Sequence, residues 1–95
     1  MTNETSRSVV ISNPQGLHLR PAHGFVALAS KFDSDIRVSR EDGEVVDGKS
    51  ILSLITLGAA QGTELTVRAE GADAETAVSE LTEYLEGLDE VEPPA

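Results

Sequence analysis

The sequence predicts a small α+β domain in which helices gather on one face of an antiparallel sheet. Its 95 residues suit one hydrophobic core, and because cysteine is absent, packing alone must stabilise that core. Period-two and helical hydrophobic patterns alternate in the order strand, helix, strand, strand, helix, strand, helix. The two central strand patterns are separated by a short turn, which favours an antiparallel hairpin.

The first strand and the first helix flank a loop of turn-forming residues. Val9 and Ile11 alternate with their neighbours, and this pattern stops at Asn13-Pro14-Gln15-Gly16. Proline is tolerated only in the first turn of a helix, so the helix must begin within a residue or two of residues 18–21. Its apolar face is predicted to comprise Phe25, Leu28, Ala29 and Phe32.

A hairpin and a short helix follow in the sequence. Residues 35–39 alternate with period two, residues 41–43 mark a reversal, and Gly48 is expected to end the second strand of the hairpin. Ser50 is a suitable N-cap for the short helix and Gly58 a suitable stop. The apolar residues of this helix are Ile51, Leu54, Ile55 and Leu57.

The last strand and the last helix have the clearest patterns. Residues 64–69 alternate again, with Leu65, Val67 and Ala69 on one side. Asp73 is the expected N-cap of the final helix. Its apolar stripe comprises Ala74, Ala77, Val78, Leu81, Tyr84, Leu85 and Leu88.

Composition narrows the class of protein. The net charge of −10 opposes binding to nucleic acid. The most apolar stretch, residues 51–60, is about half a membrane span, and the N-terminus lacks the regions of a signal peptide. We therefore expect a cytoplasmic protein without membrane insertion. One domain is expected over residues 1–88, followed by an acidic, proline-containing tail over residues 89–95.

The segment Gly16-Leu17-His18-Leu19-Arg20-Pro21-Ala22 carries the chemistry. It lies in residues 1–40, which hold five cations against three acids, although the whole chain is acidic. Backbone N–H groups and the dipole at a helix N-terminus form an anion site worth about 0.3 to 1 kcal/mol, and up to about 2 when partly buried. The imidazole of His18 is a nucleophile near neutral pH, and Arg20 can contact phosphoryl oxygens. The alternative without phosphate chemistry is that His18 only caps a helix and that Arg20 is a solvated surface cation.

This heptapeptide resembles the active-site signature of the HPr family, written G-[LIM]-H-x-R-P-A. HPr proteins are phosphocarriers of the bacterial phosphoenolpyruvate-dependent phosphotransferase system. The resemblance continues through residues 25–32, 48–58 and 62–67 with Glu70-Gly71, and covers roughly residues 7–88. It implies an open-faced sandwich of a four-stranded antiparallel sheet with three helices on one face.

The resemblance implies a phosphoryl carrier, not an autonomous enzyme. Enzyme I would phosphorylate His18 on Nδ1 at the expense of phosphoenolpyruvate, and an A-domain of a sugar permease or regulator would receive the group. The implied phosphate contacts are the backbone N–H groups of Leu19 and Arg20 and the Arg20 side chain. We expect no cofactor and no metal, because the sequence has no P-loop and no cluster of metal ligands. We also expect a monomer.

Ser50 matches the serine that an ATP-dependent HPr kinase phosphorylates in many family members. A phosphate there would add a charge of about −1.5 to −2 beside the partner-binding face. The implied partner surface comprises His23, Ile51, Leu52 and Ile55, whereas Leu54 and Leu57 are expected in the core. Ala27 and Ser30 stand where many members have lysine, which reduces the basic rim.

Three alternatives remain open at the sequence level. The first is a nitrogen-type regulatory carrier that signals through its phosphorylation state without sugar transport. The second is a co-regulator module that binds a transcription factor after Ser50 phosphorylation and does not use His18. The third is an ordinary α+β interaction domain. The hairpin turn over residues 40–43 is about one residue longer than in common relatives, which we interpret as loop variation.

Overall fold

The computed structural model describes residues 3–88, and the predicted tail over residues 89–95 lies outside the described residues. The order of strands and helices is the one that the sequence predicts. In chain order the elements are β1 (Glu4–Val10), α1 (Leu19–Ala29), β2 (Asp35–Arg40), β3 (Val45–Asp47), α2 (Ile51–Leu57), β4 (Glu64–Glu70) and α3 (Ala74–Glu86).

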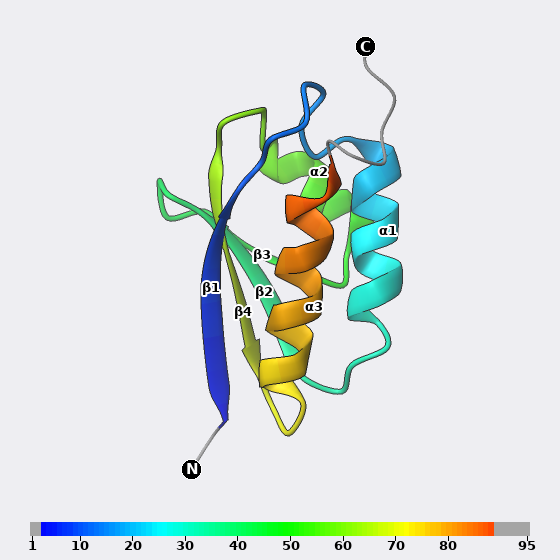
Figure 1. Cartoon of the computed structure of the whole chain (residues 1–95), viewed down its shortest axis with the longest axis vertical. Coiled ribbons are helices and arrows are strands. Elements are labelled where there is room, and N and C mark those ends of the chain that lie inside the picture. The colour runs from blue at the N-terminus through cyan, green and yellow to red at the C-terminus, as the bar shows by residue number, and fades with distance from the viewer. Residues whose placement is uncertain (1–2, 89–95) are drawn as a thin grey trace.

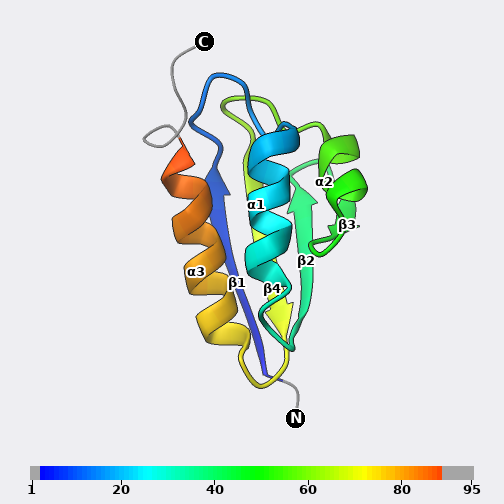
Figure 2. The ribbon, with the colours of Figure 1, turned by 90° about the vertical axis from the view of Figure 1, so that its right-hand side faces the viewer.

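The four strands form one sheet in the order β1-β4-β2-β3, and every neighbouring pair is antiparallel. The helices cover one face of this sheet and the other face is open, as Figures 1 and 2 show from two directions. The open-faced sandwich is therefore confirmed. None of the helices within residues 3–88 is long and apolar enough to cross a membrane.

The core lies between the sheet and the helices. Leu65, Val67 and Ala69 of the central strand β4 are fully buried, as their alternation predicts. Burying a side chain of the size of leucine or valine stabilises the fold by about 1.5 to 3 kcal/mol. The predicted apolar stripe of α3 packs against β1 and β4, and Tyr84 is its only partly buried member. Phe25 is the largest side chain that the core encloses.

The short helix α2 is capped at both ends as predicted. The Ser50 hydroxyl accepts a hydrogen bond from the Ser53 N–H at 3.2 Å. Gly58 has a left-handed backbone with a φ of 67°, which suits glycine at a helix C-terminus. Leu54 and Leu57 are fully buried, which confirms the expected core face of this helix.

Two local expectations differ from the structure. Strand β1 already begins at Glu4, because residues 4–8 pair with β4 although they lack apolar alternation. Asp73 does occupy the N-cap position of α3, but its side chain makes no capping hydrogen bond. Its carboxylate instead accepts hydrogen bonds from the N–H groups of Asp33 and Ser34, at 2.9 and 3.0 Å, and from the Ser34 hydroxyl.

Candidate functional site

The loop that leads to His18 lies against the loop between α2 and β4. The N–H of Ile11 donates to the Thr63 carbonyl at 2.9 Å, and the N–H of Gly62 donates back to Ile11 at 2.7 Å. Closer to His18, the N–H of Leu17 donates to the Ala59 carbonyl at 2.8 Å. These backbone bonds make the α2–β4 loop the support of the candidate site.

A compact turn shapes this loop. The buried Asn13 side chain donates from Nδ2 to the Gly16 carbonyl at 2.8 Å, and the Gly16 N–H donates to the Asn13 carbonyl at 3.1 Å. Gly16 has a φ of 70°, and a Cβ there would collide with the Ala59 carbonyl oxygen. Only glycine fits this close approach. The sequence indicates the turn, but not that Asn13 organises it from inside the fold.

His18 is the N-cap residue of α1, with extended backbone angles. Its N–H donates to the Gly16 carbonyl and its carbonyl accepts from the Ala22 N–H, both at 3.0 Å. Leu19, Arg20 and Pro21 therefore form the first turn, where N–H groups have no acceptor within the helix. Because proline has no N–H, Leu19 and Arg20 supply the donors of this turn. The sequence-based limit on where the helix starts is confirmed.

The accessibility of these residues suits contact with an incoming anion. Arg20 is exposed, His18 is half-buried, and the Leu19 side chain is 63% exposed. The positive end of the helix dipole coincides with the two backbone donors, and Arg20 is a residue of the same turn. This end of α1 therefore places N–H donors and an exposed arginine directly after His18 in the chain, a combination suited to an anion.

Tyr84 of α3 fixes the first turn of α1. Its hydroxyl donates to the Pro21 carbonyl at 3.1 Å, and a Cβ on Gly24 would lie only 2.8 Å from Cζ of the Tyr84 ring. The glycine thus lets α3 approach α1 closely. In the sequence, Tyr84 belongs to the apolar stripe, and nothing predicts this contact except a glycine inside one helix and a tyrosine in the stripe of another.

The residues expected at a partner surface lie on α1 and α2. Figures 1 and 2 both place α2 beside the N-terminal half of α1. Leu52 is 74% exposed and Ile55 is 37% exposed, and His23 is exposed as well. Ile51, by contrast, is half-buried. The exposed Leu19, whose side chain was not expected in this surface, adds a further apolar group at the start of α1.

Ser50 is the N-cap residue of α2, as His18 is of α1, although only the Ser50 side chain accepts a capping hydrogen bond. Its neighbour Lys49 donates from Nζ to the Phe32 carbonyl at 2.8 Å, which directs that cation to the segment between α1 and β2. Within residues 3–88, no group of three or more histidine, cysteine or acidic side chains is placed to hold a metal ion.

Comparison with known proteins gives a consistent result. The family model described as "PTS HPr component phosphorylation site" matches residues 5–87. The chain is 42% identical over 84 residues to phosphocarrier protein HPr of Borreliella burgdorferi, covering 88% of this chain and 96% of that protein. It is 48% identical over 73 residues to the multiphosphoryl transfer protein of Vibrio cholerae, covering 75% of this chain and 18% of the relative.

Solved structures with a similar fold are also HPr proteins or their relatives. The crystal structure of HPr-C-His from Thermoanaerobacter tengcongensis has a TM-score of 0.85 at 38% identity, covering 94% of this chain and 99% of that chain. The solution structure of Crh, the catabolite repression HPr of Bacillus subtilis, has a TM-score of 0.65 at 36% identity, covering 86% of this chain and 96% of that chain.

Proposed function

Because the chain belongs to the HPr family of phosphocarrier proteins of the phosphotransferase system, we propose that its carrier residue is His18. Enzyme I donates the phosphoryl group, with phosphoenolpyruvate as its source, and an A-domain of a sugar permease or regulator accepts it. The observation that carries this proposal is the position of His18 as N-cap of α1, directly before the amides of Leu19 and Arg20.

The transfer needs little from this chain beyond alignment and charge. The lone pair of Nδ1 attacks phosphorus as the bond to the donor breaks. In the second transfer a nucleophile of the acceptor attacks phosphorus, and the bond to Nδ1 breaks. The N–H groups of Leu19 and Arg20 and the Arg20 guanidinium bind the phosphoryl oxygens. A helix N-terminus contributes about 0.3 to 1 kcal/mol, which holds the group without making its release slow.

The partners are proteins in this proposal. The Vibrio cholerae relative supports it, because its name describes transfer of several phosphoryl groups and this chain matches only 18% of its length. The apolar side chains of Leu19, Leu52 and Ile55, with Arg20 at their rim, have the composition of a protein interface. His23 and the half-buried Ile51 complete the proposed surface. We place the carrier in the cytoplasm as a monomer.

The test of the carrier role is phosphorylation by Enzyme I and phosphoenolpyruvate. The wild-type chain should acquire acid-labile phosphate, and His18→Ala should acquire none, because the nucleophile is lost. His23→Ala is the control, since it removes the other histidine of the chain, and it should reach the same final extent of labelling even if its place in the proposed surface slows the reaction. Label that persists in His18→Ala would contradict the assignment.

We further propose that an ATP-dependent HPr kinase phosphorylates Ser50. The phosphate would sit at the N-terminus of α2, next to the proposed partner surface, and would repel an acidic partner. Incubation with the kinase and ATP should give acid-stable label that Ser50→Ala abolishes and the nearby Ser53→Ala retains. Acid-stable label on Ser50→Ala would move the site elsewhere.

A regulatory function remains the second candidate, supported by the similarity to Crh. In one form the carrier signals through phosphorylated His18 without sugar transport, and in another the Ser50-phosphorylated chain binds a transcription factor without using His18. Presence of the histidine, arginine and proline of the signature favours transfer through His18. Label on His18 that passes to a sugar-specific A-domain would decide for the carrier role.

A further inference from the structure

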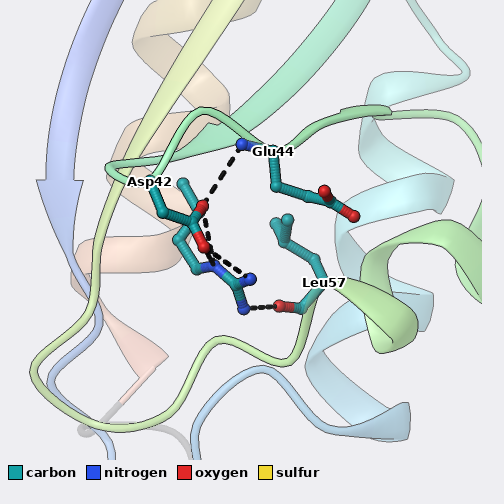
Figure 3. Close-up of polar contacts among 4 residues, drawn as sticks. Asp42, Glu44 and Leu57 are labelled. Carbon is teal, nitrogen blue, oxygen red and sulfur yellow. Dashed lines mark hydrogen bonds and ion pairs between the residues drawn. The ribbon is translucent and has the colours of Figure 1, made fainter.

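Arg40, at the end of β2, connects the β2–β3 hairpin with the C-terminus of α2. Its Nη1 donates to the carbonyl of Leu57, the last residue of α2. Its Nε lies 3.2 Å from both carboxylate oxygens of Asp42, and its Nη2 lies 2.9 Å from Oδ2 (Figure 3). The guanidinium therefore bridges a carboxylate and a helix end.

The hairpin turn holds this carboxylate in place. Asp42 Oδ1 accepts a hydrogen bond from the Glu44 N–H at 3.2 Å, and the turn is closed by the Gly43 N–H, which donates to the Arg40 carbonyl at 2.9 Å. The hydrogen bonds from Arg40 and Glu44 keep the pKa of Asp42 below its usual value, so the carboxylate stays ionised. The sequence suggests only that this turn varies in length among relatives. In the structure, the turn orients the Arg40 side chain.

Leu57, whose carbonyl Arg40 binds, lies two residues before Ala59, whose carbonyl supports the loop that leads to His18. Leu57 is followed by the left-handed Gly58 and then by the buried Ala59, whose carbonyl accepts the hydrogen bond from the Leu17 N–H. Leu17 precedes His18 directly. A cation at the last turn of a helix also interacts favourably with the exposed carbonyls there.

We propose that Arg40 is a positioning residue for His18, because it holds the Leu57–Ala59 segment against which the backbone of Leu17 is bonded. It does not touch the phosphoryl group and acts only through this backbone. The role deepens the carrier function proposed above and depends on it for its effect on transfer. Its effect on the loop itself does not depend on that function.

Arg37 provides a matched control on the same strand. It pairs with Asp35 two residues away, at 3.3 Å, much as Arg40 pairs with Asp42. Its side chain lies on the open face of the sheet, however, among residues that include Glu4 and Arg68. An exposed ion pair of this kind contributes little to stability, so Arg37→Gln should fold as the wild type does.

The first measurement is hydrogen exchange of individual backbone amides in Arg40→Gln and Arg37→Gln. In Arg40→Gln the Leu17 amide should exchange about three- to tenfold faster than in the wild type, while the Val67 amide in the central strand changes less than twofold. Arg37→Gln should leave Leu17 unchanged. Arg40→Lys should give an intermediate rate, since an ammonium can reach the Leu57 carbonyl but cannot bridge it to Asp42 as a fork.

The second measurement is the rate of phosphoryl transfer from phosphorylated Enzyme I. Arg40→Gln should lower kcat about three- to tenfold with KM changed less than twofold, and Arg40→Lys should restore part of the loss.

Three results would overturn the proposal: a Leu17 amide that exchanges alike in Arg40→Gln and Arg37→Gln, equal acceleration at Leu17 and Val67, or a kcat that stays unchanged while Leu17 exchanges faster. Failure of the wild type to be labelled on His18 refutes the carrier function instead, and the exchange comparison then still decides whether Arg40 positions the loop.

Discussion

Ser34 and Asp73 show how one side-chain contact joins two loops. Ser34 lies between α1 and β2 and is buried, while Asp73 lies between β4 and α3. Three hydrogen bonds from the Asp33–Ser34 segment meet the Asp73 carboxylate. The hydrogen bond from the Ser34 hydroxyl, followed by that from the Asp33 N–H, lowers the pKa of Asp73 below its ordinary value of 3.8. Ionised Asp73 is therefore part of the native contact.

The pH dependence of stability should reveal this contact. Because the pKa of Asp73 is lower in the folded chain than in the unfolded one, its stabilisation is fully present above about pH 4 and is lost as the pH falls through the folded value. Asp73→Asn should have a lower Tm than the wild type at pH 7, and the difference should shrink below about pH 4. Thermal unfolding from pH 7 to pH 2 measures this. Asp33→Asn, which keeps the Asp73 carboxylate, serves as control, and a gap that is constant with pH would contradict the prediction.

Arg20 should matter through its guanidinium and not only through its charge. A guanidinium can donate two parallel hydrogen bonds to phosphoryl oxygens, whereas an ammonium acts as a point charge. Arg20→Ala should therefore lower the rate of transfer to His18 by about tenfold or more, and Arg20→Lys should restore only part of it. Rapid-quench kinetics with phosphorylated Enzyme I gives the rate. Arg68→Ala, a change on the open face of the sheet, should leave it unaltered, and equal rates for Arg20→Ala and the wild type would refute the role.

At the scale of elements, α2 has two faces with different tasks. Leu54 and Leu57 are fully buried against the core, whereas Leu52 projects into solvent with 74% of its surface exposed. The helix has seven residues, too few to be stable alone in water. Its stability must come from the buried face, the Ser50 cap and the left-handed Gly58.

Two leucine variants should separate these tasks. Leu54→Ala should destabilise the fold by about 2 to 5 kcal/mol, because it leaves a cavity in the core. Leu52→Ala should change stability by less than about 0.5 kcal/mol. The free energy of unfolding in denaturant measures both. Under the proposed function, Leu52→Ala should nevertheless raise the KM for phosphoryl transfer from Enzyme I, and a destabilisation equal to that of Leu54→Ala would contradict the assignment of faces.

At the scale of the whole molecule, charge is distributed unevenly. Residues 41–95 hold two of the seven basic residues and fourteen of the seventeen acidic ones. The exposed side of α3 is acidic, with Glu75, Glu80, Glu83 and Glu86 opposite its buried stripe. Like charges at this density repel one another and oppose the compact state. Helix α3 packs beside α1, where the Tyr84 hydroxyl bonds to the Pro21 carbonyl, so the acidic and the basic parts of the chain are neighbours in the fold.

Added salt should therefore stabilise this protein. The Debye length falls from about 30 Å at 0.01 M to about 10 Å at 0.1 M ionic strength, which screens repulsion between separate carboxylates. We expect Tm at pH 7 to rise across this range of sodium chloride. The triple variant Glu75→Gln, Glu80→Gln, Glu83→Gln should show a smaller rise, because it removes three of the repelling charges. A Tm that falls with salt would mean that the surface ion pairs outweigh the repulsion.

The sequence by itself determined the features that local chemistry controls. Alternation in β4 placed Leu65, Val67 and Ala69 in the core, and Pro21 restricted the start of α1, since each depends only on the backbone geometry of a short segment. The signature around His18 likewise lies in consecutive residues. The identity of the fold and the candidate carrier residue could therefore be predicted without coordinates.

Only the tertiary structure decided which distant groups meet. Tyr84 bonds to Pro21 across 63 positions, Ser34 to Asp73 across 39, and Arg40 to Leu57 across 17. None of these contacts leaves a periodic pattern, and Asp73 even has the local features of a cap that it does not form. Such partners are chosen by the packing of α3, the hairpin and α2 around one sheet, because a polar side chain bonds to whichever donor or acceptor the folded chain brings within about 3 Å.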